Sequence, residues 1–417
     1  MKKCNNAKAL GQAELNEDGK PSLRRTTAVH RVEDTENSEV ILFHLFEIYN
    51  RFDVNYTDES GYTHFHAACK SRNYHAIEKF LELGQDPNCI VPETGDSPLH
   101  LIIAKDHGFD RAIQLLIRSG ADPTLPNKEG LTPLHVICKL IYYESVAKTF
   151  LEICDDVQLI VQVDARDELG RTPLQLAVAN LSPGTVDVLL DRGADLSSFV
   201  FPTEDYFGKE RKPDDYSRLP NWYFFLVSSA MIVVERLEKR GYELERSGAL
   251  TIMKFFIKHA FFKNSEDFKK CLNSDKIFAC AAKETMFVPG LSFYDFIQLP
   301  CEKAEKLLTH ENLFKLDITE DFLYERITVH RPCVAQLCEM RTRRFLRRWA
   351  LEPLLELTRH YRLPIPCCEF QNISDLAYII AWARETHAQV STRFGAQTAE
   401  CRLPRVCISS DSSRAAQ

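Results

Sequence analysis

Three short segments contain residues whose types and spacing could carry out covalent chemistry. Ser97 lies in the sequence Thr-Gly-Asp-Ser-Pro, where a reactive serine could be suspected. Cys69 follows His66 by three residues, a spacing that could place a thiol beside a base. Cys367 and Cys368 are adjacent and could form a redox pair, with two core positions as the favoured alternative. The sequence has no phosphate-binding Gly-rich loop with Lys-Ser or Lys-Thr, no nucleophile elbow and no paired-His zinc motif.

The sequence around Ser97 and His66 is repeated along the chain. A pattern close to Gly-x-Thr-Pro-Leu-His begins at four glycines that lie 34, 35 and 40 residues apart, Gly61, Gly95, Gly130 and Gly170. A second landmark, a glycine followed two residues later by Asp, recurs at Gly84, Gly120 and Gly193. Two motifs in fixed phase over a period of ~33 residues indicate a stack of repeated helix pairs.

The residue types of the motif have a physical explanation. Thr132 can cap free N–H groups at a helix start, and Pro133 suits the first helical position, where no N–H donor is needed. Leu134 then faces the stack, and Gly120 can end a helix in a left-handed conformation. Because one helix pair cannot bury its own apolar face, neighbouring pairs must stack.

The register of the repeats favours structural roles for the candidate residues. Ser97 takes the helix-capping position and Cys69 a packing position, so capping and packing are favoured over catalysis. His66, His100 and His135 share the motif position. There, hydrogen bonds to the backbone between repeats are favoured over metal binding.

These motifs resemble those of ankyrin repeats over roughly residues 38–198. The resemblance implies an all-α ankyrin-repeat solenoid, with an N-terminal cap and four repeats over 37–198, followed by a helical C-terminal domain. The first repeat has His64 where Pro is expected, and the fourth has Gln175 in place of the motif His. The third lacks the Gly-Ala-Asp ending and has about five extra residues around Cys154–Gln162, which we interpret as a displaced loop.

The composition of the remaining chain predicts its organisation. Residues 1–36 and the tail 403–417 are polar and are predicted to be disordered. Residues 199–220 contain prolines and glycine among charges and predict a linker loop, and 221–402 form the helical C-terminal domain. The apolar run Trp222–Val234 is shorter than the ~20 residues that span a bilayer, so it predicts a buried helix and no membrane association.

The distal half resembles a second family. The segments Arg236–Leu244, Leu291–Ile297 and Leu363–Glu369 are similar to the C-terminal region of ankyrin proteins of parasitoid wasps, which is similar to the PRANC domain of poxviral ankyrin proteins. In the poxviral relatives its last, F-box-like part, here residues 363–386, recruits a cullin–RING ubiquitin ligase through a Skp-family adaptor.

The F-box resemblance implies a set of adaptor-binding residues, Leu363, Pro364, Ile365, Cys368, Leu376 and Ile379. The family places an Ile- and Leu-rich helix before an Asp-Leu step. Here about four or five residues of it are missing between Glu369 and Asp375. This shortening predicts weak or absent adaptor binding.

Charge and cysteine usage narrow the classes of partner. The formal net charge of -7 argues against a protein built to bind nucleic acid or an anionic membrane. The 14 cysteines show no disulfide framework and no zinc spacing, so we expect reduced thiols, no metal and no cofactor. Met1–Lys20 has no apolar signal core, so we expect a cytoplasmic protein, with the nucleus as the alternative. The arginine cluster Arg341–Arg348 predicts a solvated helix face, with a nuclear-import or acidic-partner patch as the alternative.

The sequence therefore predicts a monomeric, non-enzymatic protein that binds a partner protein through the concave surface of its repeats. The tips that join the repeats project from the stack, so we expect them to contact the partner: Asp58, Glu59, Ser60, Val91, Pro92, Glu93, Pro126, Asn127, Lys128, Arg166, Asp167 and Glu168. The alternative function is that of a substrate receptor of a cullin–RING ubiquitin ligase. A third hypothesis is an enzyme whose active site lies in the helical C-terminal half.

Overall fold

The computed structural model describes most of the first three quarters of the chain. The described residues are 24–32, 37–104, 110–140, 144–208, 220–258, 276–284, 286–299 and 301–307, with 337, 338, 340–342, 344–346, 348 and 349. The chain divides into two compact units, residues 1–344 and 345–417, and the repeats lie in the first.

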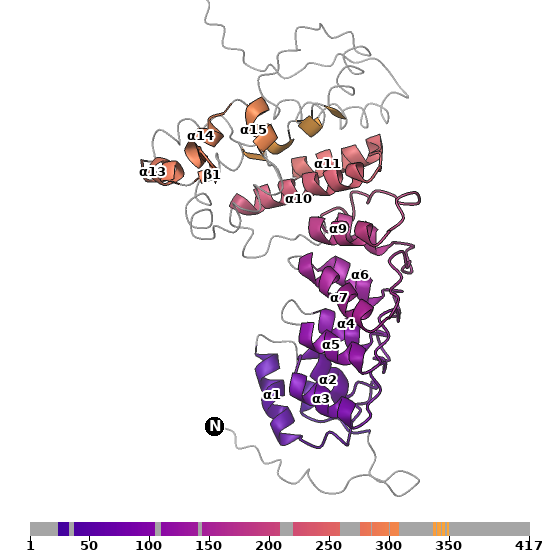
Figure 1. Cartoon of the computed structure of the whole chain (residues 1–417). Helices are drawn as coiled ribbons and strands as arrows, with labels where there is room; N and C mark the ends of the chain where they lie inside the picture. The colour runs from indigo at the N-terminus through magenta and orange to yellow at the C-terminus, as the bar shows by residue number, and fades with distance from the viewer. Residues whose placement is uncertain are drawn as a thin grey trace, which may run out of the picture. The chain divides into compact units, whose positions relative to one another are not determined.

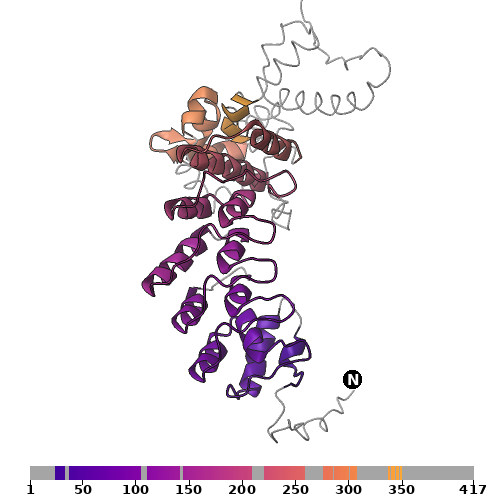
Figure 2. The same cartoon turned by 90° about the vertical axis from the view of Figure 1, so that its right-hand side faces the viewer.

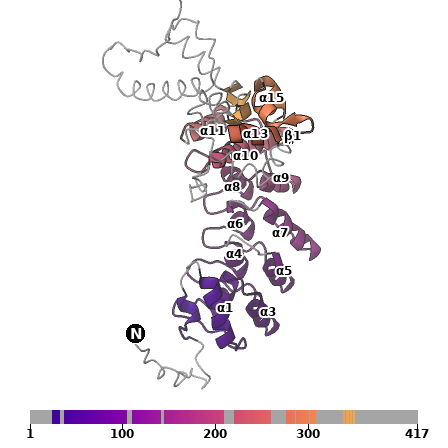
Figure 3. The same cartoon turned by 90° about the vertical axis from the view of Figure 1, so that its left-hand side faces the viewer.

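Each of the four repeats forms a pair of helices. The first helices are α2 (His64–Lys70), α4 (Pro98–Ile103), α6 (Pro133–Lys139) and α8 (Pro173–Ala179). The second helices are α3 (Tyr74–Glu82), α5 (Asp110–Arg118), α7 (Glu144–Asp156) and α9 (Pro183–Asp191). First helices pack on first helices and second helices on second helices. Figure 1 shows the stack, and Figure 3 shows its two columns. The predicted ankyrin-repeat solenoid is confirmed.

The predicted capping chemistry starts these helices. The Thr132 side chain accepts the backbone N–H of His135, and Pro133 is the first residue of α6. Leu134 is completely buried, in the middle of the stack. Gly120 adopts a φ of 95° where α5 ends, the left-handed conformation that favours glycine.

A further, degenerate repeat precedes these four. It corrects the prediction of disorder for residues 24–32, whereas the rest of the span 1–36 lies outside the described residues. Val29–Arg31 form a 3-10 helix, η1, and α1 (Ser38–Ile48) takes the place of a second helix. Thr27 and His30 reproduce the motif, because the Thr27 N–H donates to His30 Nδ1 at 3.0 Å and His30 Nε2 contacts the Tyr56 carbonyl at 3.1 Å. The Thr-x-x-His spacing was the available signal for this unit.

Residues 199–208, predicted as part of a linker loop, instead form a packed strap. The Gly208 N–H donates to the Ala179 carbonyl of α8 at 2.7 Å, and Phe199, Phe201 and Phe207 are buried. Phe207 packs against Phe255 of the next helix pair, with centroids 5.3 Å apart, and Phe201 packs against Phe207 at 5.4 Å. Phe199 packs against Tyr242 at 5.1 Å.

That next pair consists of α10 (Pro220–Lys239) and α11 (Arg246–Lys258). Helix α10 packs on α9, and Arg236 of α10 forms an ion pair with Asp187 of α9 at 3.1 Å. Within the part of the chain that the structure describes, no helix combines the length and apolar character needed to cross a membrane.

Short elements follow: α13 (Lys276–Glu284), the antiparallel strands β1 (Met286–Val288) and β2 (Leu291–Ser292), α14 (Phe293–Ile297) and α15 (Cys301–Leu307). The ribbon is a small exception to the all-α prediction. Phe287 of β1 stacks on Phe296 of α14 with a centroid distance of 3.8 Å, so the ribbon shares the core of this segment.

Candidate protein-binding face

The hairpin tips and the first helices form one face of the stack, here called the tip face. Figure 2 shows the loops projecting from the repeats on one side, away from the second helices. This face was predicted to be the concave, partner-binding surface. Its geometry depends on how each tip is closed, how the tips stack and which side chains remain exposed.

Three of the residues predicted to bind a partner also close the tips. The side-chain oxygens of Asp58, Asn127 and Asp167 each accept two backbone N–H groups, from the residues two and four positions further on. Asp167 also pairs with Arg171 at 2.7 Å and is buried. These residues are occupied because a reversing chain must satisfy its own N–H groups.

Successive tips are joined through their backbones. The Lys128 N–H donates to the Thr94 carbonyl at 3.0 Å, and the Glu168 N–H donates to the Glu129 carbonyl at 3.0 Å. The fit is close at Gly130, where an added Cβ would lie 2.7 Å from the Glu168 nitrogen. The second, third and fourth tips therefore form a row joined by backbone hydrogen bonds.

The tip side chains divide into exposed and structural groups. Eight of the predicted residues are exposed: Glu59, Ser60, Pro92, Glu93, Pro126, Lys128, Arg166 and Glu168. Val91 was wrongly predicted to project. It is buried because its N–H and carbonyl close the turn with Asp96 and Gly95, which draws the side chain inward. On the first helices, Lys139 is exposed, and Leu101 and Val136 are half-buried. Ala104, directly after α4, is also exposed.

The motif histidines connect one repeat to the next. His100 Nδ1 accepts the Ser97 N–H at 3.1 Å, so Nε2 carries the ring proton and donates to the Leu131 carbonyl at 2.7 Å. His66 and His135 make the same contacts, as the sequence predicted. Gln175 makes both contacts of the motif histidine. Its side-chain oxygen accepts the Thr172 N–H at the start of α8, and its side-chain NH2 donates to the Val200 carbonyl.

Burial determines the charge state of these groups. Desolvation lowers the pKa of His66, His100 and His135, so the rings stay neutral, as their hydrogen bonds require. Desolvation also raises the pKa of the Cys69 thiol well above its usual range. A thiol that stays protonated is a poor nucleophile, which agrees with a packing role for Cys69. No group of three potential metal ligands occurs among the described residues.

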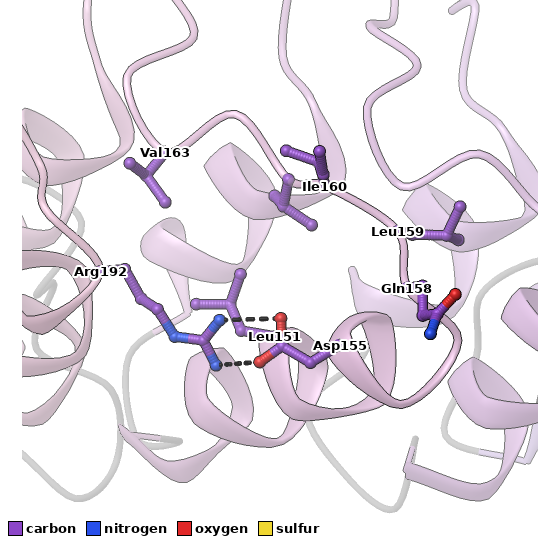
Figure 4. A pocket seen from close by; sticks show the side chains of 8 residues that line it. Leu151, Asp155, Gln158, Leu159, Ile160, Val163 and Arg192 are labelled. Carbon is purple, nitrogen blue, oxygen red and sulfur yellow. Dashed lines mark hydrogen bonds and ion pairs between the residues drawn. The ribbon is translucent and has the colours of Figure 1, made fainter.

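The third repeat departs from the others beside the second helices. Gln158, at a φ of 60°, replaces the glycine that ends the other second helices, and α7 has 13 residues where α9 has nine. The predicted insertion is therefore divided between a longer helix and the loop after it. Ile160 in this loop is 80% exposed. It lines a surface pocket together with Arg192 and Asp155, which form a bidentate ion pair (Figure 4).

Other predicted sites lie partly or wholly outside the described residues. All six residues assigned to adaptor binding do so: Leu363, Pro364, Ile365, Cys368, Leu376 and Ile379. In the arginine cluster, Arg341 is buried and forms two hydrogen bonds with Glu235 of α10, at 2.8 and 2.9 Å. Arg341 is therefore not part of a solvated basic patch, whereas Arg344 and Arg348 are exposed.

Comparison with known proteins agrees with this architecture. Residues 99–199 match the family model for ankyrin repeats (3 copies). The chain is 25% identical over 158 residues to the Monkeypox virus protein Inhibitor of Apoptosis OPG037, covering 38% of this chain and 34% of that protein. It is 30% identical over 146 residues to the human B-cell lymphoma 3 protein, covering 34% and 31% of the two chains.

Among solved structures, the ankyrin repeat domain of Bcl-3 aligns with a TM-score of 0.35 and 21% identity, over 48% of this chain and 87% of that chain. The chain matches about a third of the length of the poxviral and human B-cell lymphoma 3 proteins. The family model matches the repeats, and ankyrin repeats imply an interaction with a partner protein. The comparisons do not identify that partner.

Proposed function

We propose that this ankyrin-repeat protein is a non-enzymatic scaffold that binds a partner protein through the tip face. The observation that supports the proposal is that each tip is closed by its own residues. Asp58, Asn127 and Asp167 close three of the tips with their side chains, and the backbone of Val91 closes the fourth. Exposed side chains beside these residues, such as Glu59 and Glu93, therefore project from turns that are already closed. A row of tips whose backbones are already joined favours binding, because the backbone loses little conformational entropy when a partner docks.

The test begins with affinity capture by the full chain and identification of the captured proteins by mass spectrometry. Binding of the captured partner is then measured for the triple variant Glu59→Ala, Glu93→Ala and Glu168→Ala. We expect a loss of at least about tenfold in affinity, or about 1.4 kcal/mol. The free energy of unfolding should change by less than ~1 kcal/mol, as for ordinary surface substitutions.

A matched control removes three exposed carboxylates from the second helices, with Glu82→Ala, Glu152→Ala and Asp156→Ala. It changes the net charge equally and should leave binding intact. Equal losses in both variants would indicate a nonspecific charge effect. Intact binding in the tip variant would contradict the proposal and move the binding site elsewhere.

A second candidate function is a substrate receptor of a cullin–RING ubiquitin ligase. It is favoured by the Leu363-Pro364 sequence, which resembles an F-box start, and by the similarity of the repeats to a poxviral protein. The experiment compares capture of a Skp-family adaptor and a cullin by the full chain, by Leu363→Asp, and by a chain with four residues inserted after Phe370. Capture by the unmodified chain that Leu363→Asp abolishes would support this function. Capture only after the insertion would indicate that the shortened segment has lost it.

A further inference from the structure

The hydrogen bonds between the tips all have the same direction. Where successive tips are joined among the described residues, the donor lies in the later tip and the acceptor in the earlier one. The Lys128 N–H donates to the Thr94 carbonyl at 3.0 Å, and Lys128 Nζ donates to the Pro92 carbonyl at 2.6 Å. The Glu168 N–H donates to the Glu129 carbonyl at 3.0 Å in the same way. A tip of this row therefore presents a backbone carbonyl to the tip that follows it.

The row ends at the fourth tip, residues 166–170, where this carbonyl has no donor. Leu169 is the counterpart of Glu129, because each directly precedes a tip glycine with a φ of 74°. No donor in the part of the chain that the structure describes reaches the Leu169 carbonyl. An added Cβ at Gly130 would lie 2.7 Å from the Glu168 nitrogen, whereas no described atom lies within 4 Å of one at Gly170. The fourth tip thus has the acceptor and the clearance for a following tip.

The strap passes this end of the row without forming a fifth tip. It covers the base of the fourth tip, where the Arg171 guanidinium lies over the Tyr206 ring, 5.1 Å from its centroid. It then turns towards α11, against which Phe207 packs. Leu169 is left 65% exposed, although its side chain is large and apolar. The end of the tip row is therefore an accessible backbone edge that carries an apolar side chain.

We propose that a partner protein docks a turn or an extended segment on this edge, in the place of a further tip. This inference rests on the proposed function and specifies how the partner engages the tip face. The segment donates a backbone N–H to the Leu169 carbonyl, as Lys128 and Glu168 do within the row. It covers the exposed Leu169 side chain with an apolar residue and places a basic residue near the exposed Glu168. An unpaired backbone edge is a template for such added chain, and side-chain contacts then give specificity.

The test uses a defined probe, an mRNA-displayed library of short random peptides, each closed into a loop by a thioether bond. A closed loop resembles a tip, and the thioether does not exchange with the thiols of the chain. The library is selected on the full chain, and the dissociation constants of the selected peptides are measured by fluorescence anisotropy.

The substitution Gly170→Asn places a side chain where the backbone of the docked segment would lie. Asparagine tolerates a positive φ better than most residues, so the tip should keep its conformation. We expect a family of selected peptides whose affinity falls about tenfold or more for Gly170→Asn and for Leu169→Asp. Methylation of one backbone nitrogen in such a peptide should cause a similar loss, because it removes the N–H donor and changes no side chain.

The matched control is Gly193→Asn, at the end of α9. Gly193 also has a positive φ, 84°, and no described atom lies within 4 Å of its added Cβ. This variant should bind the selected peptides as the unmodified chain does. Circular dichroism checks that each variant is folded.

A library that yields no binder would overturn this inference, as would peptides that all bind Gly170→Asn as tightly as the unmodified chain. Neither result would contradict the proposed function, because its test measures a captured partner protein and the side chains of Glu59, Glu93 and Glu168. Conversely, a triple variant that keeps its partner would contradict the proposed function, even if peptide binding depended on Gly170.

Discussion

The hydrogen-bonding capacity of single residues explains much of the motif. In His100, Nδ1 accepts the backbone N–H of the residue that caps its own helix, and Nε2 donates to a backbone carbonyl before the next helix pair. Gln175 has the same pair of functions in its amide, which explains why it replaces histidine without loss of either contact. At the N-terminal end the arrangement is more crowded, because His64 Nε2 lies 2.7 Å from Thr27 Oγ1 and the His30 and His64 rings are 4.7 Å apart.

The stability of the stack should fall in mild acid. Burial, and secondarily the charge of a protonated His30, lowers the pKa of His64 to about 3. Below pH ~6.5 the unfolded chain takes up a proton at His64 that the folded chain excludes, so the free energy of unfolding decreases as the pH falls towards 3. His64 alone should contribute a loss of ~2 kcal/mol between pH 7 and pH 5. Urea unfolding at both pH values measures it.

The substitution His64→Gln should reduce this pH dependence, because the amide does not titrate. His75→Gln, on the exposed surface of α3, is the matched control and should leave the pH dependence as it is. An unchanged dependence in His64→Gln would show that other groups determine the acid sensitivity. Burial also lowers the pKa of His30, so part of the dependence should persist in this variant.

Two tip glycines with the same backbone conformation should respond differently to substitution. Gly130 and Gly170 both have a φ of 74°. An added Cβ at Gly130 would lie 2.7 Å from the Glu168 nitrogen, whereas at Gly170 nothing lies within 4 Å. Gly170→Ala should lower the free energy of unfolding by only ~1–2 kcal/mol, the cost of placing an alanine in the left-handed backbone conformation. Gly130→Ala should cost more, because two tip backbones must separate, and thermal unfolding compares the two. Equal costs would show that the tips separate easily.

The elements behave as repeated units that depend on their neighbours. The N-terminal unit keeps the hydrogen bonds of the motif although its first helix is reduced to the single turn of η1. In the third repeat, Gln158 keeps the helix ending without glycine. Units that lack the usual motif residues therefore keep the backbone conformation and hydrogen bonds of the repeat, because each unit must satisfy the same donors and acceptors towards its neighbours.

The substitution Leu134→Ala should show this dependence between repeats. Leu134 is completely buried in α6, so its truncation should cost ~2–5 kcal/mol through lost burial and a cavity. Native-state hydrogen exchange should show reduced protection in α4, α6 and α8 together, because α6 packs on both neighbours. Val136→Ala, at a half-buried position of the same helix, should cost less. A change confined to α6 would argue against a cooperative stack.

At the scale of the whole molecule, the strap and the α10–α11 pair continue the repeat stack. Glu204 of the strap pairs with Lys254 of α11, and Asp191 of α9 pairs with Arg240 at the end of α10. Val186 and Leu189 of α9 are completely buried in this arrangement. The fourth repeat is thus covered by α10 on its second helix and by the strap at the end of its first helix.

A chain that ends after Ser198 should therefore be less stable than one that ends after Lys258. The shorter chain lacks the strap and α10, so α9 and the end of α8 lose their cover. We expect a melting temperature lower by about 5 °C or more, since ~1 kcal/mol corresponds to a few degrees in domains of this size. Differential scanning calorimetry of both chains tests this. Equal melting temperatures would mean that the fourth repeat needs no cap.

The sequence by itself determined the repeated architecture and the roles of the motif residues. Glycine at a positive φ, proline at the first helical position and a capping hydroxyl are local requirements of the backbone, and residue types such as Gly130, Pro133 and Thr132 reveal them directly. The same local logic placed Leu134 in the core and favoured structural roles for His100 and His135.

Only the tertiary structure decided which tip residues are available and where the stack ends. Val91 and Asp167 lie in the predicted tips, yet the turn and its ion pair bury them, and such contacts depend on geometry that the sequence pattern does not specify. The strap at 199–208 has the composition of a loop, with Pro, Gly and charged residues, and its three phenylalanines become buried only in tertiary contacts such as Phe199 with Tyr242 and Phe207 with Phe255. The exposure of apolar side chains on α1 is also invisible in the sequence, because an apolar residue gives no sign of whether a neighbour covers it.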